Sequence, residues 1–524
     1  MSVKREKKKQ SNDKHRLRTV LLSIFWILVI VMLFFSVITT PLLSWYDEKF
    51  GVSFSQIYHT ITGKMEGADT SFLFDALKCI RVSAVFVCFA AIGVLILEHF
   101  FSVLDISIRY RIFALKGRIS VKGVFRFLSF ALTVVLFTGA LIKIDNALGI
   151  TEYLTARTKP TTIYEDYYVD PSSVSITNMG EKRNLIMIYL ESMETTYAPQ
   201  EIGGFQKVNN TSDNYIPGLT YFADEYISFS NSELLGGFHS VSGTGWTYAS
   251  IFAQSVGIPY SFDNVEIDTK KNNYTSSAKA IGDILSENGY NQEFLCGSNA
   301  SFANRDDFFK RHGDYEIFDY NTAIEKGYIA PDYKVWWGLE DKILYKMAKD
   351  EAVRLSELGE PFNLTMLTVD THHVEGYVCD LCDDTYDEQL ANVLDCADNQ
   401  IEDFIDWCQK QDFYDDTTIV IVGDHPRMDN YLVGGVDYYD RTVYNCFINA
   451  VPKYDAKDYV NREFSAMDMF PTTLSALGFK IEGNRLGLGV DMFSGEQTLM
   501  EKLGYEEMDK ELSGFSKYYN EHFY

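Results

Sequence analysis

The chain has 524 residues, 46% of them hydrophobic, and a formal net charge of −26 at pH 7. This charge is uneven, because the first 150 residues carry 19 Lys and Arg but only 10 Asp and Glu, and the remainder is strongly acidic. An acidic surface disfavours nucleic acid, whose phosphates need basic side chains to neutralise them. We therefore expect no nucleic-acid partner, and the length allows a large hydrophobic core.

Three long apolar segments in the basic N-terminal part predict a membrane region over residues 19–144. They cover residues 19–43, 79–99 and 123–144, and each is close to the roughly 20 residues that cross a bilayer as a helix. A cleaved signal peptide explains the first segment poorly, because the segment is too long and no small-residue cleavage site follows closely. We predict about three transmembrane helices, preceded by a basic tail at residues 1–18.

The basic residues between these segments predict the orientation of the chain. Residues 1–18 hold eight Lys and Arg and the loop at 100–122 holds five, whereas the loop at 45–78 holds three. Because cytoplasmic loops are enriched in Lys and Arg, the N-terminus and the second loop are expected to be cytoplasmic. With three spans, the chain after about residue 145 would lie outside a cell membrane that it crosses several times.

The acidic part of the chain has the pattern of an α/β domain. Residues 145–182 are polar and predict a linker, and apolar runs then alternate with segments of helical periodicity. Strands buried on both faces are predicted at 184–192, 291–297, 361–370 and 415–424, and helices at 276–290 and 392–411. This alternation predicts a mostly parallel sheet covered by helices over residues 183–497, followed by a C-terminal tail at 498–524.

Carboxylate and imidazole side chains directly follow three of the predicted strands. Glu191 follows the apolar run of the first strand, His372 and His373 follow the third strand, and Asp424 and His425 follow the apolar run of the last strand and its glycine. In parallel sheets, ligands bind beyond the carboxyl ends of the strands. One such residue alone could be a solvated loop acid or a hydrogen-bonded histidine. Together they supply oxygen and nitrogen donors that suit zinc or manganese, and they predict a metal or phosphate site at this edge.

A glycine-rich stretch contains a candidate nucleophile. The segment GGFHSVSGTGWT ends at Thr247 and precedes an apolar, helix-like stretch. A hydroxyl at a helix N-terminus lies where backbone N–H groups stabilise an anion, and a neighbouring metal would lower its pKa. Taken alone, Thr247 would be interpreted as a helix N-cap, so its catalytic interpretation depends on the residues at the strand ends.

Together these motifs resemble the alkaline phosphatase/sulfatase superfamily, and within it the membrane phosphoglycerol transferases, which include the lipoteichoic acid synthases. The resemblance covers residues from about 164 to 495 and implies the corresponding α/β fold after a helical membrane region. It also implies that Thr247 is the nucleophile. The implied ligands of one divalent cation, manganese first with magnesium or zinc as alternatives, are Glu191, Thr247, Asp424 and His425.

The same resemblance implies residues that bind the substrate. Arg305, in FANRD, matches a phosphate-binding arginine, and His372, in TVDTHH, matches a substrate-binding histidine that could also protonate the leaving group. His373 is a second candidate, and Trp337, in WWGLEDK, is expected near the substrate. Ala303 departs from the lipoteichoic acid synthases, which have tryptophan there, so the glycerol pocket is expected to differ.

The implied activity is transfer of glycerophosphate from phosphatidylglycerol, through a phospho-threonine intermediate, to a hydroxyl group. The acceptor would be a cell-envelope glycan, a glycolipid or polyglycerol phosphate. A phosphoethanolamine transferase, or a metal-dependent phosphodiesterase or phosphatase of the same superfamily, is the alternative, because the metal ligands would be the same. A formylglycine sulfatase is not expected, since no C-x-P-S-R stretch occurs.

Six of the eight cysteines lie in the acidic part of the chain. Cys379 and Cys382 form a C-x-x-C pair, which predicts either a disulfide loop or half of a zinc site. No second C-x-x-C pair occurs in the sequence, which argues against structural zinc. A disulfide remains open, because an extracytoplasmic location permits one without requiring it.

Overall fold

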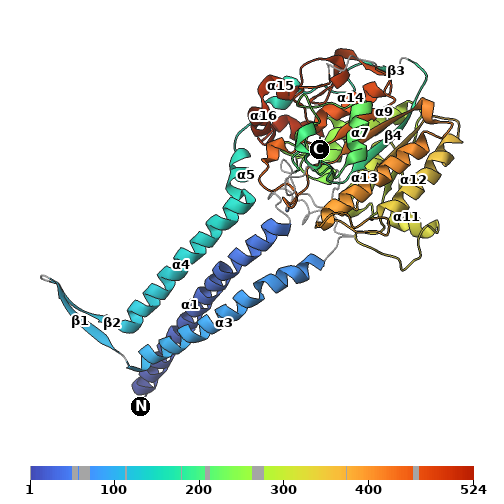
Figure 1. Cartoon of the computed structure of the whole chain (residues 1–524). Helices are drawn as coiled ribbons and strands as arrows, with labels where there is room; N and C mark the ends of the chain where they lie inside the picture. Colours follow the sequence, from blue (N-terminus) through green and yellow to red (C-terminus); the bar gives the residue numbers. More distant parts are fainter. Residues whose placement is uncertain are drawn as a thin grey trace. The chain divides into compact units, whose positions relative to one another are not determined.

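The computed structural model describes residues 2–49, 57, 71–104, 106–112, 115–178, 180–206, 213–261, 277–372, 374–452 and 459–523. They form two compact units, an N-terminal unit that extends to Ile150 and a C-terminal unit that begins at Thr151 (Figure 1). His373, one of the predicted substrate-binding residues, lies outside the described residues.

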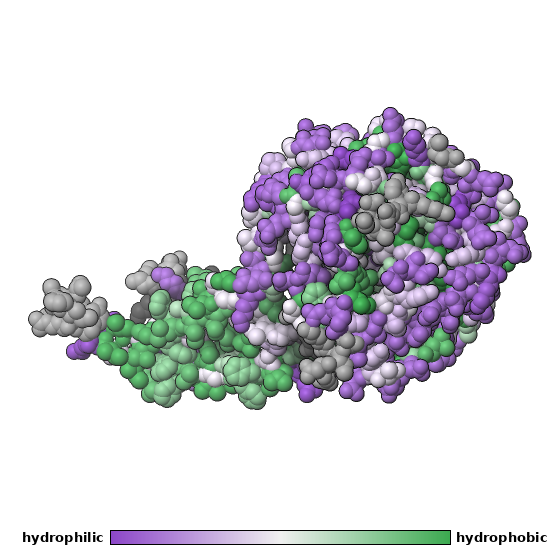
Figure 2. Space-filling view, turned by 45° about the horizontal axis from the view of Figure 1, so that its top comes forward, coloured by the Kyte–Doolittle hydropathy of each residue, from purple (hydrophilic) through white to green (hydrophobic). Residues whose placement is uncertain are grey.

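The N-terminal unit contains three long helices and a pair of antiparallel strands. The helices are α1 (Ser2–Lys49), α3 (Ser71–Leu104) and α4 (Val121–Leu148), and the strands are β1 (Ser107–Ile112) and β2 (Leu115–Ser120). Each of these helices contains a segment long and apolar enough to cross a membrane, with mean hydropathies of 3.0, 2.5 and 2.1. Figure 2 shows their hydrophobic surface in green. Within the described residues, the three predicted spans therefore all form helices of sufficient length.

A six-stranded sheet lies in the C-terminal unit. Its order is β6-β5-β7-β4-β8-β9, and neighbouring strands are parallel except β9, which is antiparallel to β8. The strands are β4 (Asn184–Leu190), β5 (Asn291–Cys296), β6 (Glu316–Phe318), β7 (Phe362–Leu367), β8 (Thr417–Gly423) and β9 (Asn445–Ile448). The continuous apolar runs of β4, β7 and β8 place them at the centre, where both faces are covered. The prediction of a mostly parallel sheet is confirmed.

Helices cover both faces of the sheet. Successive side chains of a strand point to opposite faces, so the apolar residues of the central strands need a cover on each side. Ile186 and Ile188 of β4 pack with α7 (Pro217–Glu225), α12 (Asp341–Ser356) and α13 (Gln389–Cys408), and Figure 1 shows α12 beside α13. Leu185 and Met187 belong to the core on the other face. That core includes α8 (Thr247–Val256), α9 (Ile281–Glu287), α10 (Arg305–Arg311) and α14 (Met469–Ala476).

The C-terminal unit extends beyond the predicted boundaries of 183 and 497. Residues 145–182, predicted as a linker, contain α5 (Ile150–Ala156), α6 (Ile163–Tyr167) and β3 (Ile176–Asn178), which pairs with β10 (Phe479–Ile481). These residues are mostly polar, but a few apolar side chains among them, such as Ile163 and Tyr164, are buried in the core. The helices that contain such residues are only one or two turns long, so no helical periodicity is visible in the sequence.

The predicted C-terminal tail also folds onto this unit. It forms α15 (Leu499–Leu503), α16 (Tyr505–Leu512) and α17 (Lys517–Phe523). Met500, Met508 and Tyr519 are buried in the core, and the Tyr519 ring lies 5.2 Å from that of Tyr164. The segments predicted as a linker (145–182) and as a tail (498–524) therefore pack together and stabilise each other.

Candidate active site

The carboxyl ends of two adjacent strands bring together most of the predicted metal ligands. Since β4 lies between β7 and β8, the residues that follow these strands meet at one edge of the sheet. Glu191 follows β4, and Asp424 and His425 follow β8. Gly423, the last residue of β8, allows this close approach, because an added Cβ would lie 2.1 Å from the carbonyl oxygen of Met193.

Two carboxylates and one imidazole form a compact, buried cluster. Nε2 of His425 lies 3.4 Å from Oδ2 of Asp424 and 3.7 Å from Oε1 of Glu191. All three residues are at most 2% exposed. Their ligand atoms lie within 4.8 Å of one another, close enough to bind one metal ion.

The hydrogen bonds around this cluster leave its inner atoms available to a cation. Oδ1 of Asp424 accepts backbone N–H bonds from Ser192 and His425 at 2.7 and 2.8 Å, whereas its Oδ2 is buried with no hydrogen-bond partner among the described residues. Nδ1 of His425 lies 2.7 Å from the carbonyl oxygen of Pro426. That contact favours a proton on Nδ1 and a free lone pair on Nε2, the arrangement common in metal-bound histidines. The donor set therefore fits a divalent metal ion.

The charges of the cluster also favour a bound cation. Burial, together with the negative charge of Glu191, raises the pKa of Asp424 to about 7. Burial alone would raise the pKa of Glu191, but the nearby His372 and His425 and a hydrogen bond from Ser192 hold it below the ordinary value. Two buried carboxylates this close repel each other, and a divalent cation would relieve that repulsion.

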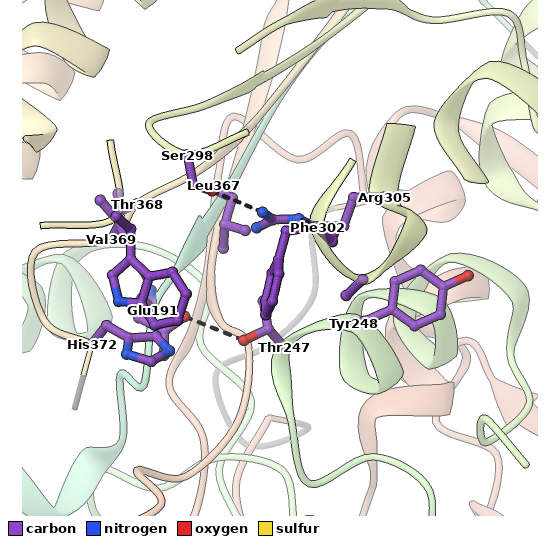
Figure 3. Close-up of a pocket in the computed structure, with 12 residues that line it drawn as sticks. Glu191, Thr247, Tyr248, Ser298, Phe302, Arg305, Leu367, Thr368, Val369 and His372 are labelled. Carbon is purple, nitrogen blue, oxygen red and sulfur yellow. Dashed lines mark hydrogen bonds between the residues drawn. The ribbon is translucent and has the colours of Figure 1, made fainter. Parts of the chain in front are cut away.

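Thr247 places a hydroxyl group beside this cluster. It is the first residue of α8, after a loop in which Gly243 has φ +82°, a conformation that favours glycine. Its Oγ1 lies 3.3 Å from Oε2 of Glu191 (Figure 3). It also lies 3.3 Å from Nε2 of His425. Gln254, later in α8, donates a hydrogen bond to the carbonyl oxygen of Gly423 and so ties this helix to β8.

Arg305 lies on the other side of a pocket of about 460 Å³, a volume that includes space open to solvent. Ala303 and Asn304 precede it with φ of 55° and 60°, two consecutive left-handed residues that are not glycine. Strained backbone of this kind tends to occur at functional sites. The turn aims the guanidinium of Arg305 into the pocket, where it donates to the Ser298 hydroxyl at 2.8 Å (Figure 3).

Aromatic rings and His372 line the same pocket. The ring of Trp337 lies 4.9 Å from that of His372 and 5.5 Å from that of Phe302. Both Trp337 and His372 are half-buried and line the pocket with Glu191 and Thr247. The structure therefore brings together every predicted site residue that it describes.

Three residues that position this site were not identified from the sequence. Ser192 has φ 54° and donates a hydrogen bond to Glu191 and its backbone N–H to Asp424. Ser298 holds Arg305, and Phe302 separates Arg305 from Thr247 in Figure 3. Serine and phenylalanine are common in loops and cores, so only the FANRD motif, which begins at Phe302 and lies four residues after Ser298, could have pointed to these two residues.

A buried ion pair supports the loops behind the cluster. Glu194 accepts two hydrogen bonds from Arg441 at 2.9 and 2.6 Å and one from the backbone N–H of Arg427 at 3.1 Å. Arg427 in turn donates to the carbonyl oxygen of Thr371, next to His372. Burial alone would raise the pKa of Glu194, but Arg441 holds it below its ordinary value.

Comparison with known proteins agrees with this geometry. Residues 183–479 match the family described as Sulfatase. Phosphoglycerol transferase I of Escherichia coli (strain SMS-3-5 / SECEC) is 29% identical over 337 residues, which cover 63% of this chain and 41% of that protein. Phosphoglycerol transferase I of Xanthomonas axonopodis pv. citri is 30% identical over 263 residues, or 48% of this chain and 35% of that protein.

The chain thus spans about two fifths or less of the length of these curated relatives. Among solved structures, the lipoteichoic acid synthase LtaP from Listeria monocytogenes is 19% identical, with a TM-score of 0.46, over 63% of this chain and 81% of that one. The family match covers more than half of the chain and contains Glu191, Thr247, Arg305, Asp424 and His425. The chain belongs to the sulfatase family.

Proposed function

We propose that this protein is a membrane-anchored phosphoglycerol transferase. It would move glycerophosphate from phosphatidylglycerol to a hydroxyl of a cell-envelope glycan, a glycolipid or polyglycerol phosphate. The observation that carries this proposal is the Thr247 hydroxyl, which lies 3.3 Å from both Glu191 and His425 and borders a pocket that Arg305 also lines. The relatives named phosphoglycerol transferase I support the choice of phosphoglycerol as the transferred group.

Glu191, Asp424 and His425, with the Thr247 hydroxyl, would hold one divalent cation, and we propose manganese, with magnesium or zinc as alternatives. When bound, the cation would polarise a phosphoryl oxygen and lower the pKa of the hydroxyl. The unpartnered Oδ2 of Asp424 supports this assignment. Nothing in the cluster requires a second cation.

In the proposed first step, Oγ1 of Thr247 attacks the phosphorus of phosphatidylglycerol. The Thr247 hydroxyl gives up its proton, the bond from phosphorus to the diacylglycerol oxygen breaks, and that oxygen takes up a proton. His372, which lines the pocket, is a candidate donor of that proton. Arg305 stabilises the charge on the phosphoryl oxygens, which is the main requirement of such transfers. In the second step an acceptor hydroxyl attacks the same phosphorus and releases Thr247.

The three apolar helices would anchor the enzyme in the membrane that contains its lipid donor, which raises the local concentration of that donor. From the distribution of Lys and Arg, we propose that the N-terminus is cytoplasmic and that the C-terminal unit is extracytoplasmic. The acceptors named above are accessible on that side of the membrane.

The donor can be tested with the full chain in detergent, supplied with manganese and mixed micelles of a single phospholipid. We expect diacylglycerol release from phosphatidylglycerol and little from phosphatidylethanolamine. The Thr247→Ala variant is the control for contaminating lipases. Faster release from phosphatidylethanolamine by the wild type would contradict the donor, and equal release by the variant would contradict the nucleophile.

A further inference from the structure

Three cysteines converge at a place that the proposed reaction does not use. Cys379 and Cys382 lie in the loop between β7 and α13, and Cys396 lies on α13 itself. The sulfur of Cys379 is 3.8 Å from that of Cys396 and 3.8 Å from that of Cys382. All three sulfurs lie within 4.8 Å of one another. Cys379 and Cys396 are buried, and Cys382 is half-buried.

These distances match a metal site better than a disulfide. A disulfide requires about 2.05 Å between the sulfurs and joins only two of them. Sulfurs at the corners of a tetrahedron around zinc, with bonds of about 2.3 Å, lie about 3.8 Å apart. The two separations that join Cys379 to its neighbours both have this value, and a single ion would use all three thiols.

A fourth donor lies beside the cluster. Nε2 of Gln400, one turn after Cys396 on α13, is 3.4 Å from the Cys396 sulfur. Its Oε1 is buried with no hydrogen-bond partner among the described residues. Turning this amide by half a rotation would place the oxygen, in place of the nitrogen, beside the Cys396 sulfur. The fourth position can therefore be filled by Gln400 or by a water molecule.

We propose that Cys379, Cys382 and Cys396 bind one zinc ion in a structural site separate from the candidate active site. Thiolates prefer a soft cation such as zinc, whereas the oxygen and nitrogen donors of the active site also suit manganese. The missing second C-x-x-C pair is replaced by a cysteine from a helix.

The location suggests what such an ion would stabilise. The loop between β7 and α13 begins next to the Thr368–His372 segment, which lines the candidate active site. Two hydrogen bonds already fold this loop, from Tyr377 to the Asp370 carbonyl and from Gln389 to the Gly376 carbonyl. Zinc would fix the middle of the loop to α13 and so keep His372 beside the pocket.

The test uses the full chain in detergent, purified under reducing conditions, stripped of metal and titrated with cobalt as a spectroscopic substitute for zinc. We expect thiolate-to-cobalt charge-transfer absorption and the intense d–d bands of a tetrahedral ion. Added zinc should remove this spectrum. Absence of thiolate-to-cobalt absorption in the wild type would overturn the proposal.

Two matched variants assign the signal. Cys382→Ala removes the most exposed of the three thiols and should abolish or strongly weaken the absorption. Cys408→Ala removes a buried thiol elsewhere on α13 and should leave it unchanged. An unchanged spectrum in Cys382→Ala would overturn the site. Neither readout depends on catalysis, so failure of the proposed transferase activity would be seen separately.

A disulfide gives a distinct result for the protein purified without reductant and with its native metal. We expect about one zinc per chain that is absent from Cys382→Ala and present in Cys408→Ala and in Asp424→Asn. An intact mass lower by two hydrogens, mapped to a bond within the three cysteines and without this zinc, would overturn the proposal.

Discussion

Among the described residues, two side-chain clusters could bind metal, and they lie on neighbouring segments of one unit but differ in donors and surroundings. Glu191, Asp424 and His425 offer oxygen and nitrogen atoms and border a pocket that also contains Thr247. The three cysteines offer sulfur, and none of them lines that pocket. Catalytic metal sites keep a position open for a reacting group, whereas structural sites are closed by protein ligands.

The difference lies in what surrounds each cluster. The first cluster follows the ends of rigid central strands, where the positions of the ligands are fixed by the sheet. The second joins a loop to a helix across 17 residues of sequence, where a bound ion would add a further link between the two. Substitutions in the first cluster should therefore lower turnover and remove its metal, whereas substitutions in the cysteine cluster should remove a different ion.

The largest effect is expected for Thr247→Ala. Loss of the attacking hydroxyl should lower turnover by at least about a thousandfold, since residues of a catalytic unit contribute effects of this size. The melting temperature should change little, because the hydroxyl is a small, half-buried group. Thr247→Ser is the matched control and should keep measurable activity. Comparable rates for the alanine variant and the wild type would remove Thr247 from the mechanism.

A similarly large loss is expected for Asp424→Asn, accompanied by loss of one metal ion. The amide oxygen can still accept the N–H bonds that Ser192 and His425 make to Oδ1, so the fold should persist. The charge that would hold the cation is lost. Elemental analysis should find the metal of the first cluster missing and the zinc of the cysteine cluster retained. Unchanged metal content would contradict the ligand assignment.

A smaller effect is expected for Arg305→Lys. Lysine keeps the positive charge but cannot donate to Ser298 and to a phosphoryl oxygen with the fixed geometry of a guanidinium. We expect kcat/KM for phosphatidylglycerol to fall by roughly tenfold to a hundredfold, with bound metal unchanged. Arg311→Lys, on the same helix but paired with Asp307 at the surface, is the control. Equal effects of the two substitutions would argue against phosphate binding by Arg305.

The smallest effect on turnover at neutral pH is expected from loss of the buried ion pair between Glu194 and Arg441, which lies behind the first cluster. This pair should instead determine how stability changes in acid. The pKa of Glu194 is lower in the folded chain than its unfolded value of about 4.3. Its contribution to stability is therefore complete above that value and is lost as the pH falls through the lower folded pKa.

Glu194→Gln tests this contribution. The variant leaves Arg441 buried without its charge partner and should lower the free energy of unfolding at pH 7 by about 3 kcal/mol. Below pH 5, the melting temperature of the wild type should fall more steeply with decreasing pH than the melting temperature of the variant. Parallel pH profiles would show that the pair does not account for acid sensitivity.

The sequence predicts the first cluster well because each ligand directly follows a continuous apolar run. Such a run fixes both the strand and the point where it ends, so the positions of Glu191, Asp424 and His425 at one edge follow from the parallel sheet. Thr247 is less certain from sequence, since a glycine-rich loop followed by an apolar stretch also describes an ordinary N-cap.

The second cluster could not be predicted because its ligands depend on tertiary packing. Cys396 lies on a helix whose periodicity accounts for it as a buried core residue, and nothing local connects it to Cys379. The boundaries of the C-terminal unit were predicted too narrowly for a related reason. Buried residues such as Tyr164 and Tyr519 lie in short polar segments, and their contact across more than 350 residues has no local signal.

The most direct test of the proposed mechanism is the intact mass and peptide map of the full chain after incubation with manganese and phosphatidylglycerol, without an acceptor. We expect a glycerophosphoryl adduct on Thr247, together with released diacylglycerol, and no adduct on Thr247→Ala. An adduct on another residue, or released diacylglycerol with the wild-type chain unmodified at every time point, would contradict a two-step transfer through Thr247.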